Sequence, residues 1–176
     1  MRVALLAPVL SARDAVGTDV LGMAAALRAA GHDVRLYAEH AGGLAESVHA
    51  PAGMNAWLRG PGDALIYHYS IGWPRAPGLL ARCAARRYVR YHNVTPPEFF
   101  YGLSREHVRA CAAGRAALQE LLALDAQWLP CSPYNRDELL AHGLAPERAH
   151  VLAPFNRIDR LLETPPDPDV LDRYRH

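Results

Sequence analysis

Short apolar segments alternate with segments of helical periodicity from the first residues of this chain. Residues 2–7 (RVALLA) form a continuously apolar run that ends at Pro8, which is typical of a buried parallel strand. Apolar residues then recur at helical spacing until Gly31, namely Val20, Met23, Ala24 and Leu27. Residues 33–38 (DVRLYA) predict a second strand. The first forty residues therefore indicate a right-handed β-loop-α-β unit.

The same alternation continues to about residue 153. Further strands are expected at residues 47–50, 63–68, 87–91, 127–131 and 150–153. Helical segments are expected at residues 54–58, 77–85, 105–124 and 133–142, the last opened by Ser132 and Pro133 and ended by Gly143. This pattern predicts an α/β fold, a Rossmann-like doubly wound parallel sheet of about six or seven strands.

The loop between the first strand and its helix, residues 9–16, carries neither a G-x-G-x-x-G motif nor a Walker lysine. This argues against a nucleotide-binding oxidoreductase domain, although Glu39 stands where a ribose-binding carboxylate would be. The sequence offers Thr18 or Asp19 as the helix cap. Gly17 lies at the helix start, where backbone N–H groups and the helix dipole can hold a phosphate. Relaxation of the turn is the alternative role for Gly17.

Residues 87–98 (RYVRYHNVTPPE) mark the expected functional site. An apolar-weighted strand stops at His92 and Asn93, and two prolines then prevent a helix from starting at once. Ligands of open parallel sheets bind beyond the carboxyl ends of the strands, and residues 63–68 would deliver His68 and Tyr69 to the same edge. A polar turn without chemistry remains the alternative interpretation.

Composition narrows the possible partners. The 176 residues carry a formal net charge of +1, with 51% hydrophobic and 21% charged residues, which fits one globular domain without a nucleic-acid partner. The three cysteines lack paired spacing, and no run has the length of a membrane span, so a cytoplasmic location is expected. A local arginine cluster could contact an acidic membrane surface or simply be a solvated helix end: Arg82, Arg86, Arg87 and Arg90.

Two further expectations concern metals and the end of the chain. His68 and His92 are far apart in sequence, and no carboxylate stands at helical spacing from either, so no metal site is expected. Residues 165–176 are rich in proline and carboxylates and read as an interdomain linker after a domain of residues 1–164. The chain is therefore expected to stop where another domain begins.

Three stretches resemble the N-terminal domain of family 4 glycosyltransferases, which have the GT-B fold. They are DALIYHYSIG from Asp63, YVRYHNVTPPEFF from Tyr88, and DAQWLPCSPYNRDELLAHGL from Asp125 followed by VLAPFNRIDRL. The segment GHDVRLYAEH near the start is similar as well, so the resemblance spans essentially residues 1–164. The family's glycine-rich pair in the first loop is replaced here by Arg13, Asp14 and Ala15, with only Gly17 behind.

The resemblance implies retaining transfer of a sugar from a nucleotide-sugar donor to an acceptor hydroxyl, without a metal or another cofactor. The donor would be bound mainly by the missing C-terminal domain, so the chain alone is expected to be inactive. His92 would approach the transferred sugar as the catalytic residue. Donor phosphates would face Arg13, Asp14 and Gly17, and acceptor contacts would come from His68, Tyr69, Asn93 and Glu98. A stand-alone module that binds an acceptor or partner without catalysis is the alternative.

Overall fold

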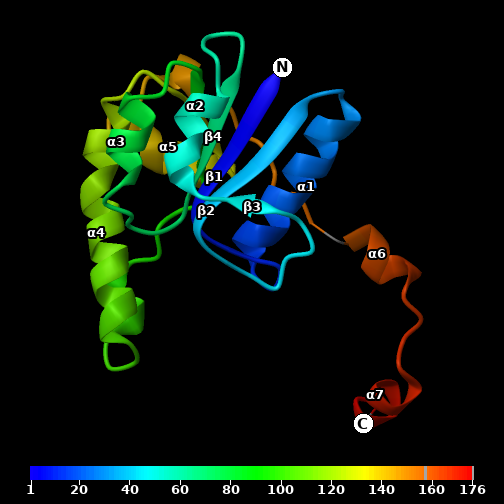
Figure 1. The fold of residues 1–176 in the computed structure, drawn as a ribbon. Coiled ribbons are helices and arrows are strands. Elements are labelled where there is room, and N and C mark those ends of the chain that lie inside the picture. Colours follow the sequence, from blue (N-terminus) through cyan, green and yellow to red (C-terminus); the bar gives the residue numbers. More distant parts are fainter. Residues whose placement is uncertain (157, 176) are drawn as a thin grey trace.

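The computed structural model describes residues 1–156 and 158–175 and is built on one six-stranded, all-parallel sheet (Figure 1). The strand order is β3-β2-β1-β4-β5-β6. The strands are β1 (Arg2–Ser11), β2 (Asp33–Gly42), β3 (Val48–His49), β4 (Ala64–Tyr69), β5 (Arg86–Tyr91) and β6 (Gln127–Pro130). The order reverses between β1 and β4, so this pair is the topological switch point at which open α/β sheets bind their ligands.

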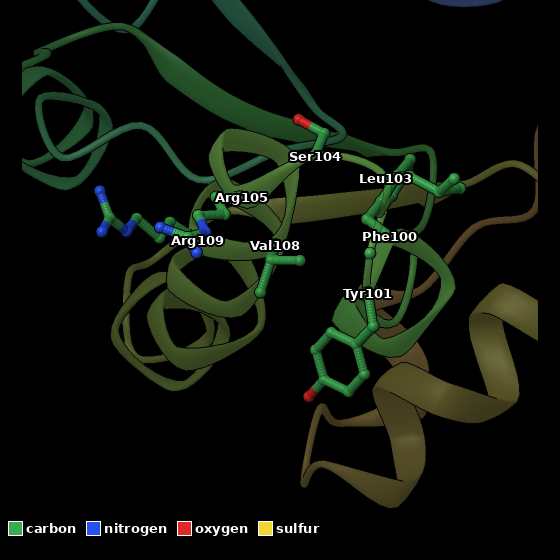
Figure 2. A pocket seen from close by; sticks show the side chains of 8 residues that line it. Phe100, Tyr101, Leu103, Ser104, Arg105, Val108 and Arg109 are labelled. Atoms are coloured by element: carbon green, nitrogen blue, oxygen red, sulfur yellow. The ribbon is translucent and has the colours of Figure 1, made fainter.

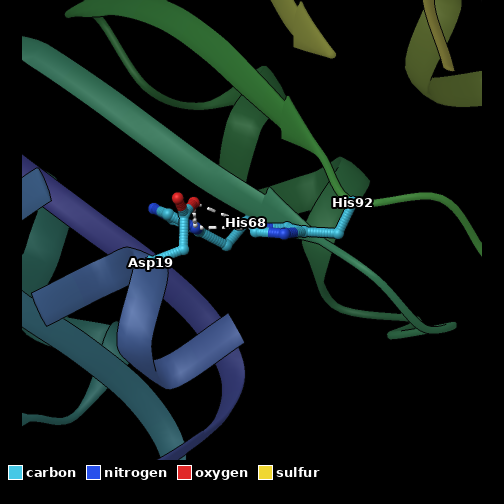
Figure 3. Close-up of side chains that lie close together, drawn as sticks. All are labelled: Asp19, His68 and His92. Carbon is cyan, nitrogen blue, oxygen red and sulfur yellow. Dashed lines mark hydrogen bonds and ion pairs between the residues drawn. The ribbon is translucent and has the colours of Figure 1, made fainter. Parts of the chain in front are cut away.

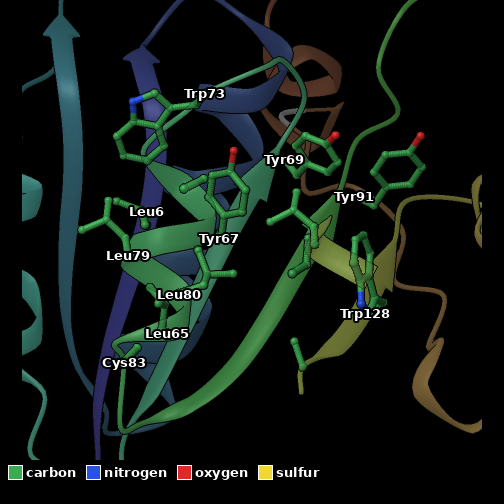
Figure 4. Close-up of a cluster of buried hydrophobic side chains, with 14 of the residues drawn as sticks. Leu6, Leu65, Tyr67, Tyr69, Trp73, Leu79, Leu80, Cys83, Tyr91 and Trp128 are labelled. Carbon is green, nitrogen blue, oxygen red and sulfur yellow. The ribbon is translucent and has the colours of Figure 1, made fainter. Parts of the chain in front are cut away.

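Helices cover both faces of the sheet, because neighbouring residues of each strand point to opposite faces. Helix α1 (Ala15–Ala29) packs on the face that carries Val3 and Leu5. The opposite face, which carries Ala4 and Leu6, packs against α2 (Met54–Trp57), α3 (Ala76–Ala81), α4 (Arg105–Leu122) and α5 (Pro133–Ala141). Figure 4 shows the larger core on this second face, with the rings of Tyr67, Tyr69, Trp73, Tyr91 and Trp128 gathered above β4, β5 and β6.

The end of β1 and the start of α1 both differ from the sequence prediction. Strand β1 does not stop at Pro8 but continues to Ser11, paired with β2, while its pairing with β4 covers only Val3 to Leu6. Proline is tolerated there because one side of the strand is no longer in the ladder. The helix then begins at Ala15, and its N-cap is Asp14 rather than Thr18 or Asp19.

Other boundaries follow the sequence closely, with one strand missing. Gly31 and Gly143 end their helices with φ of +83° and +93°, and Ser132 caps α5 through the N–H of Asn135.

Residues 150–153, expected as a seventh strand, are not a strand. Only two of their backbone N–H groups bond to the edge of β6, from His150 and Leu152, and they do not make a continuous ladder.

Two short helices follow the sheet domain. Helix α6 (Ile158–Glu163) and helix α7 (Pro168–Arg173) lie apart from the sheet in Figure 1. Helix α7 falls within the segment predicted as a linker, where Asp167 caps it. Among the described residues, none of the helices combines the length and the apolar character that a membrane crossing requires.

Candidate functional site

The switch point brings together three side chains that are far apart in the sequence. Asp19 projects from α1 and His68 from β4, and His92 is the residue that directly follows β5 (Figure 3). His68 Nδ1 lies 3.0 Å from His92 Nε2, so the two rings share a hydrogen bond. Asp19 Oδ2 lies 3.6 Å from each of these two nitrogens. Asp19 and His68 are fully buried, whereas the His92 side chain keeps 10% of its surface exposed. His92 is therefore the member of this cluster that a ligand can reach.

A buried ion pair fixes the carboxylate of this cluster. Arg90 Nε and Nη2 donate to the two oxygens of Asp19 at 2.8 and 3.0 Å, with both side chains fully buried. The backbone N–H of Phe155 adds a third donor to Asp19 Oδ1 at 2.8 Å. The remaining guanidinium nitrogen of Arg90 donates to the carbonyls of Leu129 and Leu152. The charges of Asp19 and Arg90 are thus paired and hydrogen-bonded, as a buried ion pair requires.

The burial of Arg90 contradicts the prediction that the whole arginine cluster faces a membrane or solvent. Arg90 neither faces a membrane nor lies in solvent, because its guanidinium is inside the protein. It points to the α1 face of β5, where the Asp19 carboxylate on that same face and the carbonyls of Leu129 and Leu152 stabilise the buried charge. Arg82 and Arg86 are exposed, and Arg87 is partly exposed.

The three ligand-type atoms of the cluster lie within 4.8 Å of one another, a spacing that a metal ion could in principle bridge. Zinc would need bonds of about 2 Å to two imidazoles and one carboxylate oxygen. The same oxygen of Asp19 already accepts from Arg90 Nε, and the guanidinium cation would stand next to the ion. The hydrogen bonds among these groups therefore account for the cluster as it stands, and a metal-free site stays a prediction.

Burial shifts the pKa values of the two histidines and of the neighbouring Cys131 thiol. It lowers the pKa of His92 to about 4, opposed by Asp19 and reinforced by Arg90. It also lowers the pKa of His68 well below its usual value, with His92 and Arg90 acting in the same direction. Cys131 Sγ lies 3.6 Å from His92 Nδ1, and burial raises the pKa of this thiol to about 11. At neutral pH the site therefore offers two neutral imidazoles and a thiol.

The residue after His92 has an unusual backbone conformation. Asn93 has a φ of +72°, a left-handed conformation in which asparagine is among the few residues readily accepted. Its Nδ2 donates to Asn135 Oδ1 at 3.4 Å. Beneath it, Tyr91 Oη donates to Glu138 at 2.7 Å, and Arg115 pairs with the same carboxylate at 3.1 Å. This network holds the turn that follows β5, and with it the position of the His92 backbone.

The expected phosphate loop lies at the same edge of the sheet, at the start of α1. Arg13 and Asp14 are exposed. The Gly17 N–H donates to Asp14 Oδ1 at 2.6 Å, so this donor is already used within the cap. A Cβ at Gly17 would lie 1.7 Å from the carbonyl oxygen of Ser11, which gives the glycine a packing reason of its own. A role of this loop in phosphate binding stays a prediction.

Two of the expected acceptor contacts need correction. His68 and Tyr69 lie in the interior with 0% and 1% of their surface exposed, so neither can touch an acceptor. They are buried because β4 is the central strand next to the switch point and is covered on both faces. Tyr69 Oη donates to the carbonyl of Gly114 on α4. Glu98 is exposed in the short 3₁₀ helix Pro97–Phe100, and Asn93 is partly exposed.

A separate groove lies where the chain enters α4 (Figure 2). Its lining includes Phe100, Tyr101, Leu103, Val108 and Arg109. Of the aromatic run that precedes it, Phe100 packs against the core, whereas Phe99 and Tyr101 are 69% and 68% exposed. The groove shares no lining residue with the cluster around His92.

Sequence reasoning missed three members of the site. The sequence offers Asp19, beside Thr18, as a helix cap and places Arg90 in a cluster that faces a membrane or solvent, and it assigns no site role to Cys131. A signal existed for the first two, because a carboxylate and a guanidinium each fall among the apolar positions of a predicted buried element. Their pairing spans 71 residues and has no periodicity that a sequence pattern could reveal.

The doubly wound, all-parallel sheet of this chain matches the Rossmann-like half of a GT-B fold, as the sequence predicted. Among solved structures, it is similar to WaaG, a glycosyltransferase involved in lipopolysaccharide biosynthesis, with a TM-score of 0.61 and 18% sequence identity. The match covers 97% of this chain and 50% of the WaaG chain, so this chain spans about half of that structure. No protein-family model and no curated protein matches the sequence.

Proposed function

We propose that this chain forms the acceptor-side half of a retaining, family 4 glycosyltransferase, which moves a sugar from a nucleotide-sugar donor to an acceptor hydroxyl. The observation that carries the proposal is the position of the His92 ring at the carboxyl end of β5, where it contacts the buried His68 and Asp19 side chains and keeps 10% of its own side-chain surface exposed. A polar turn without a chemical role, the alternative interpretation of residues 92 and 93, would not require the fully buried Asp19–Arg90 ion pair next to it. The fold similarity to a glycosyltransferase supports the same reading.

Each part of the edge has a role in the proposed reaction. His92 contacts the transferred sugar, and Asn93 and Glu98 contact the acceptor. The leaving diphosphate gains charge as the glycosidic bond breaks, so the Arg13 cation and the positive end of α1 stabilise the transition state more than the ground state. With these groups present, the reaction needs no metal and no cofactor besides the nucleotide sugar.

The proposed partners are a hydroxyl-bearing small molecule or glycan and a second domain that holds the nucleotide. Orientation of the donor and acceptor in one dry cleft can account for roughly 7–11 kcal/mol of the barrier in well-oriented cases. A half-site open to water cannot supply that orientation. A cytoplasmic location and a peripheral membrane contact through Arg82, Arg86 and Arg87 complete the proposal.

The test measures sugar transfer by the complete product of the gene with a panel of nucleotide sugars and hydroxyl acceptors. His92→Ala should lower turnover at least tenfold, whereas His142→Ala, an exposed histidine after α5, should leave turnover unchanged. The anomeric configuration of the product, read by proton NMR, decides whether transfer is retaining. Equal turnover of the His92→Ala and His142→Ala variants would contradict the catalytic assignment.

The 176-residue chain alone should bind nucleotide sugars weakly and transfer nothing. Calorimetric titration with the same panel measures this. Micromolar binding to the chain alone would contradict the proposed division of labour between the two halves. Tight binding of an acceptor by the complete protein, without turnover of any donor, would favour a binding module instead.

A further inference from the structure

The two stacked histidines at the switch point can share their hydrogen bond in two ways. Either His68 Nδ1 carries the proton and donates to His92 Nε2, or His92 Nε2 carries it and donates to His68 Nδ1. In the first arrangement, the proton of the neutral His92 ring is left on Nδ1. In the second, His92 Nδ1 is a bare acceptor. The direction of one buried hydrogen bond therefore decides whether His92 offers a donor or a base to a ligand.

The far nitrogen of His68 distinguishes the two arrangements. His68 Nε2 is buried and finds no hydrogen-bond partner among residues 1–156 and 158–175. If His92 were the donor, the proton of the neutral His68 ring would sit on this nitrogen as an unpaired, buried N–H. Buried N–H groups without a partner are rarer in proteins than unsatisfied acceptors. The arrangement with the His68 proton on Nδ1 leaves only a lone pair unsatisfied.

The neighbouring groups do not reverse this choice. Asp19 Oδ2 is 3.6 Å from both ring nitrogens, so it favours a proton between them without selecting its owner. Cys131 Sγ, 3.6 Å from His92 Nδ1, can either donate to or accept from that nitrogen. Arg90 is a donor only, and its bonds go to Asp19 and to backbone carbonyls.

We propose that His68 is a positioning residue that donates from Nδ1 to His92 Nε2, and thereby makes His92 a hydrogen-bond donor through Nδ1. His92 then cannot act as a general base in its resting state, because its only lone pair is engaged by His68. It presents an N–H beside Cys131, suited to an oxygen acceptor such as a sugar hydroxyl. This consequence rests on the proposed glycosyl transfer, whereas the proton positions themselves do not.

The direct test is long-range proton–nitrogen correlation NMR on the ¹⁵N-labelled 176-residue chain at neutral pH, which separates pyrrole-type from pyridine-type ring nitrogens. We expect pyrrole-type Nδ1 and pyridine-type Nε2 in both His68 and His92. A pyrrole-type Nε2 in His92 of the unmodified chain would overturn the proposal. No substrate is needed, so this outcome is separate from any failure of the transferase assay.

Two substitutions test whether His68 is the cause. His68→Asn keeps an N–H donor near the position of Nδ1, so His92 should keep its Nδ1 proton. His68→Leu removes the donor, and the His92 proton should move to Nε2, where Asp19 Oδ2 becomes its acceptor. An unchanged His92 tautomer in a folded His68→Leu variant would contradict the role of His68. If that variant does not fold, the spectrum of the unmodified chain still decides the proton positions.

Zinc titration supplies an independent check. Under the proposal, Zn²⁺ could bind Nδ1 of His68 only by moving its proton to the buried Nε2, which has no hydrogen-bond partner among the described residues, so one equivalent of Zn²⁺ should leave the His68 and His92 resonances unchanged. A stoichiometric shift of both ring signals, absent in His68→Asn, would show that these residues bind a metal in preference to the His68–His92 hydrogen bond, and would overturn the positioning role of His68.

Discussion

Arg90 on β5 and Asp19 on α1, which are 71 residues apart in sequence, form a bidentate ion pair, and both side chains are completely buried. The pair joins the central part of the sheet to the helix that covers it. It also fixes the carboxylate that lies 3.6 Å from His92 Nε2. The interior ion pair and the reachable histidine are therefore one connected structure.

Breaking this pair should be costly. Asp19→Asn or Arg90→Met leaves one buried charge without its partner, so each should lower the free energy of unfolding by about 3–5 kcal/mol, measured by urea denaturation. Arg136→Met is the matched control, because its pair with Asp137 is exposed and should contribute about 0–1 kcal/mol. A loss in Asp19→Asn no larger than in the control would mean that the buried pair contributes little.

Gly17→Ala should destabilise the protein although alanine is the better helix former. The added methyl would stand 1.7 Å from the Ser11 carbonyl oxygen, so the start of α1 must move away from β1. We expect a loss of about 1–3 kcal/mol, measured as a lower thermal midpoint. Gly78→Ala in α3 is the control. Its Cβ meets only the flexible end of Arg82, at 3.3 Å, so it should be neutral or stabilising by up to about 1 kcal/mol.

The backbone of Asn93 should tolerate glycine better than a β-branched residue. Asn93→Gly keeps the left-handed conformation at φ +72° and loses only side-chain contacts. Asn93→Val should cost about 1–3 kcal/mol more in unfolding free energy, because a β-branched side chain is strained there. Thr95→Val at an exposed position nearby should change stability by less than about 0.5 kcal/mol. Equal stability of the two Asn93 variants would show that the turn can relax.

Stability should fall as the solution becomes acidic through the histidine range. The pKa of His92 is about 4 in the folded chain, against about 6.5 for an unperturbed histidine. The unfolded chain therefore binds more protons between these values, and stability present above pH 6.5 is lost as the pH falls toward 4. The shift corresponds to about 3 kcal/mol, and His68 acts in the same direction.

Urea unfolding at several pH values between about 7 and 4.5 measures this loss. His92→Asn should flatten the dependence, whereas His142→Asn, at an exposed histidine, should keep it. The Asp19 carboxylate, the Arg90 cation, the Asp14 carboxylate and the Cys131 thiol face or influence His92 and are unchanged in both variants. A pH dependence that is identical in the two variants would remove His92 as its source.

The sequence alone determined the order and class of most elements, including six of the seven expected strands, because their signals are local. Gly31 and Gly143 end helices through a backbone conformation that glycine adopts freely, and Ser132 caps α5 through its own next turn. Runs such as residues 2–7 and 63–68 predict buried parallel strands by composition. These preferences act over a few residues, so they can be read before any fold is known.

Only the tertiary structure decided how the site is built. Asp19 has the residue type of a helix cap, yet α1 begins four residues earlier, and Asp19 pairs with Arg90 on the face of the sheet that α1 covers. His68 stands at a strand end as expected, yet its ring is enclosed, and its polar contacts within residues 1–156 and 158–175 are to His92 and Asp19. Burial and partner choice depend on which strands become neighbours. That is set by packing the whole sheet between its helices, since a buried charge or ring nitrogen takes the partner that the fold brings within reach.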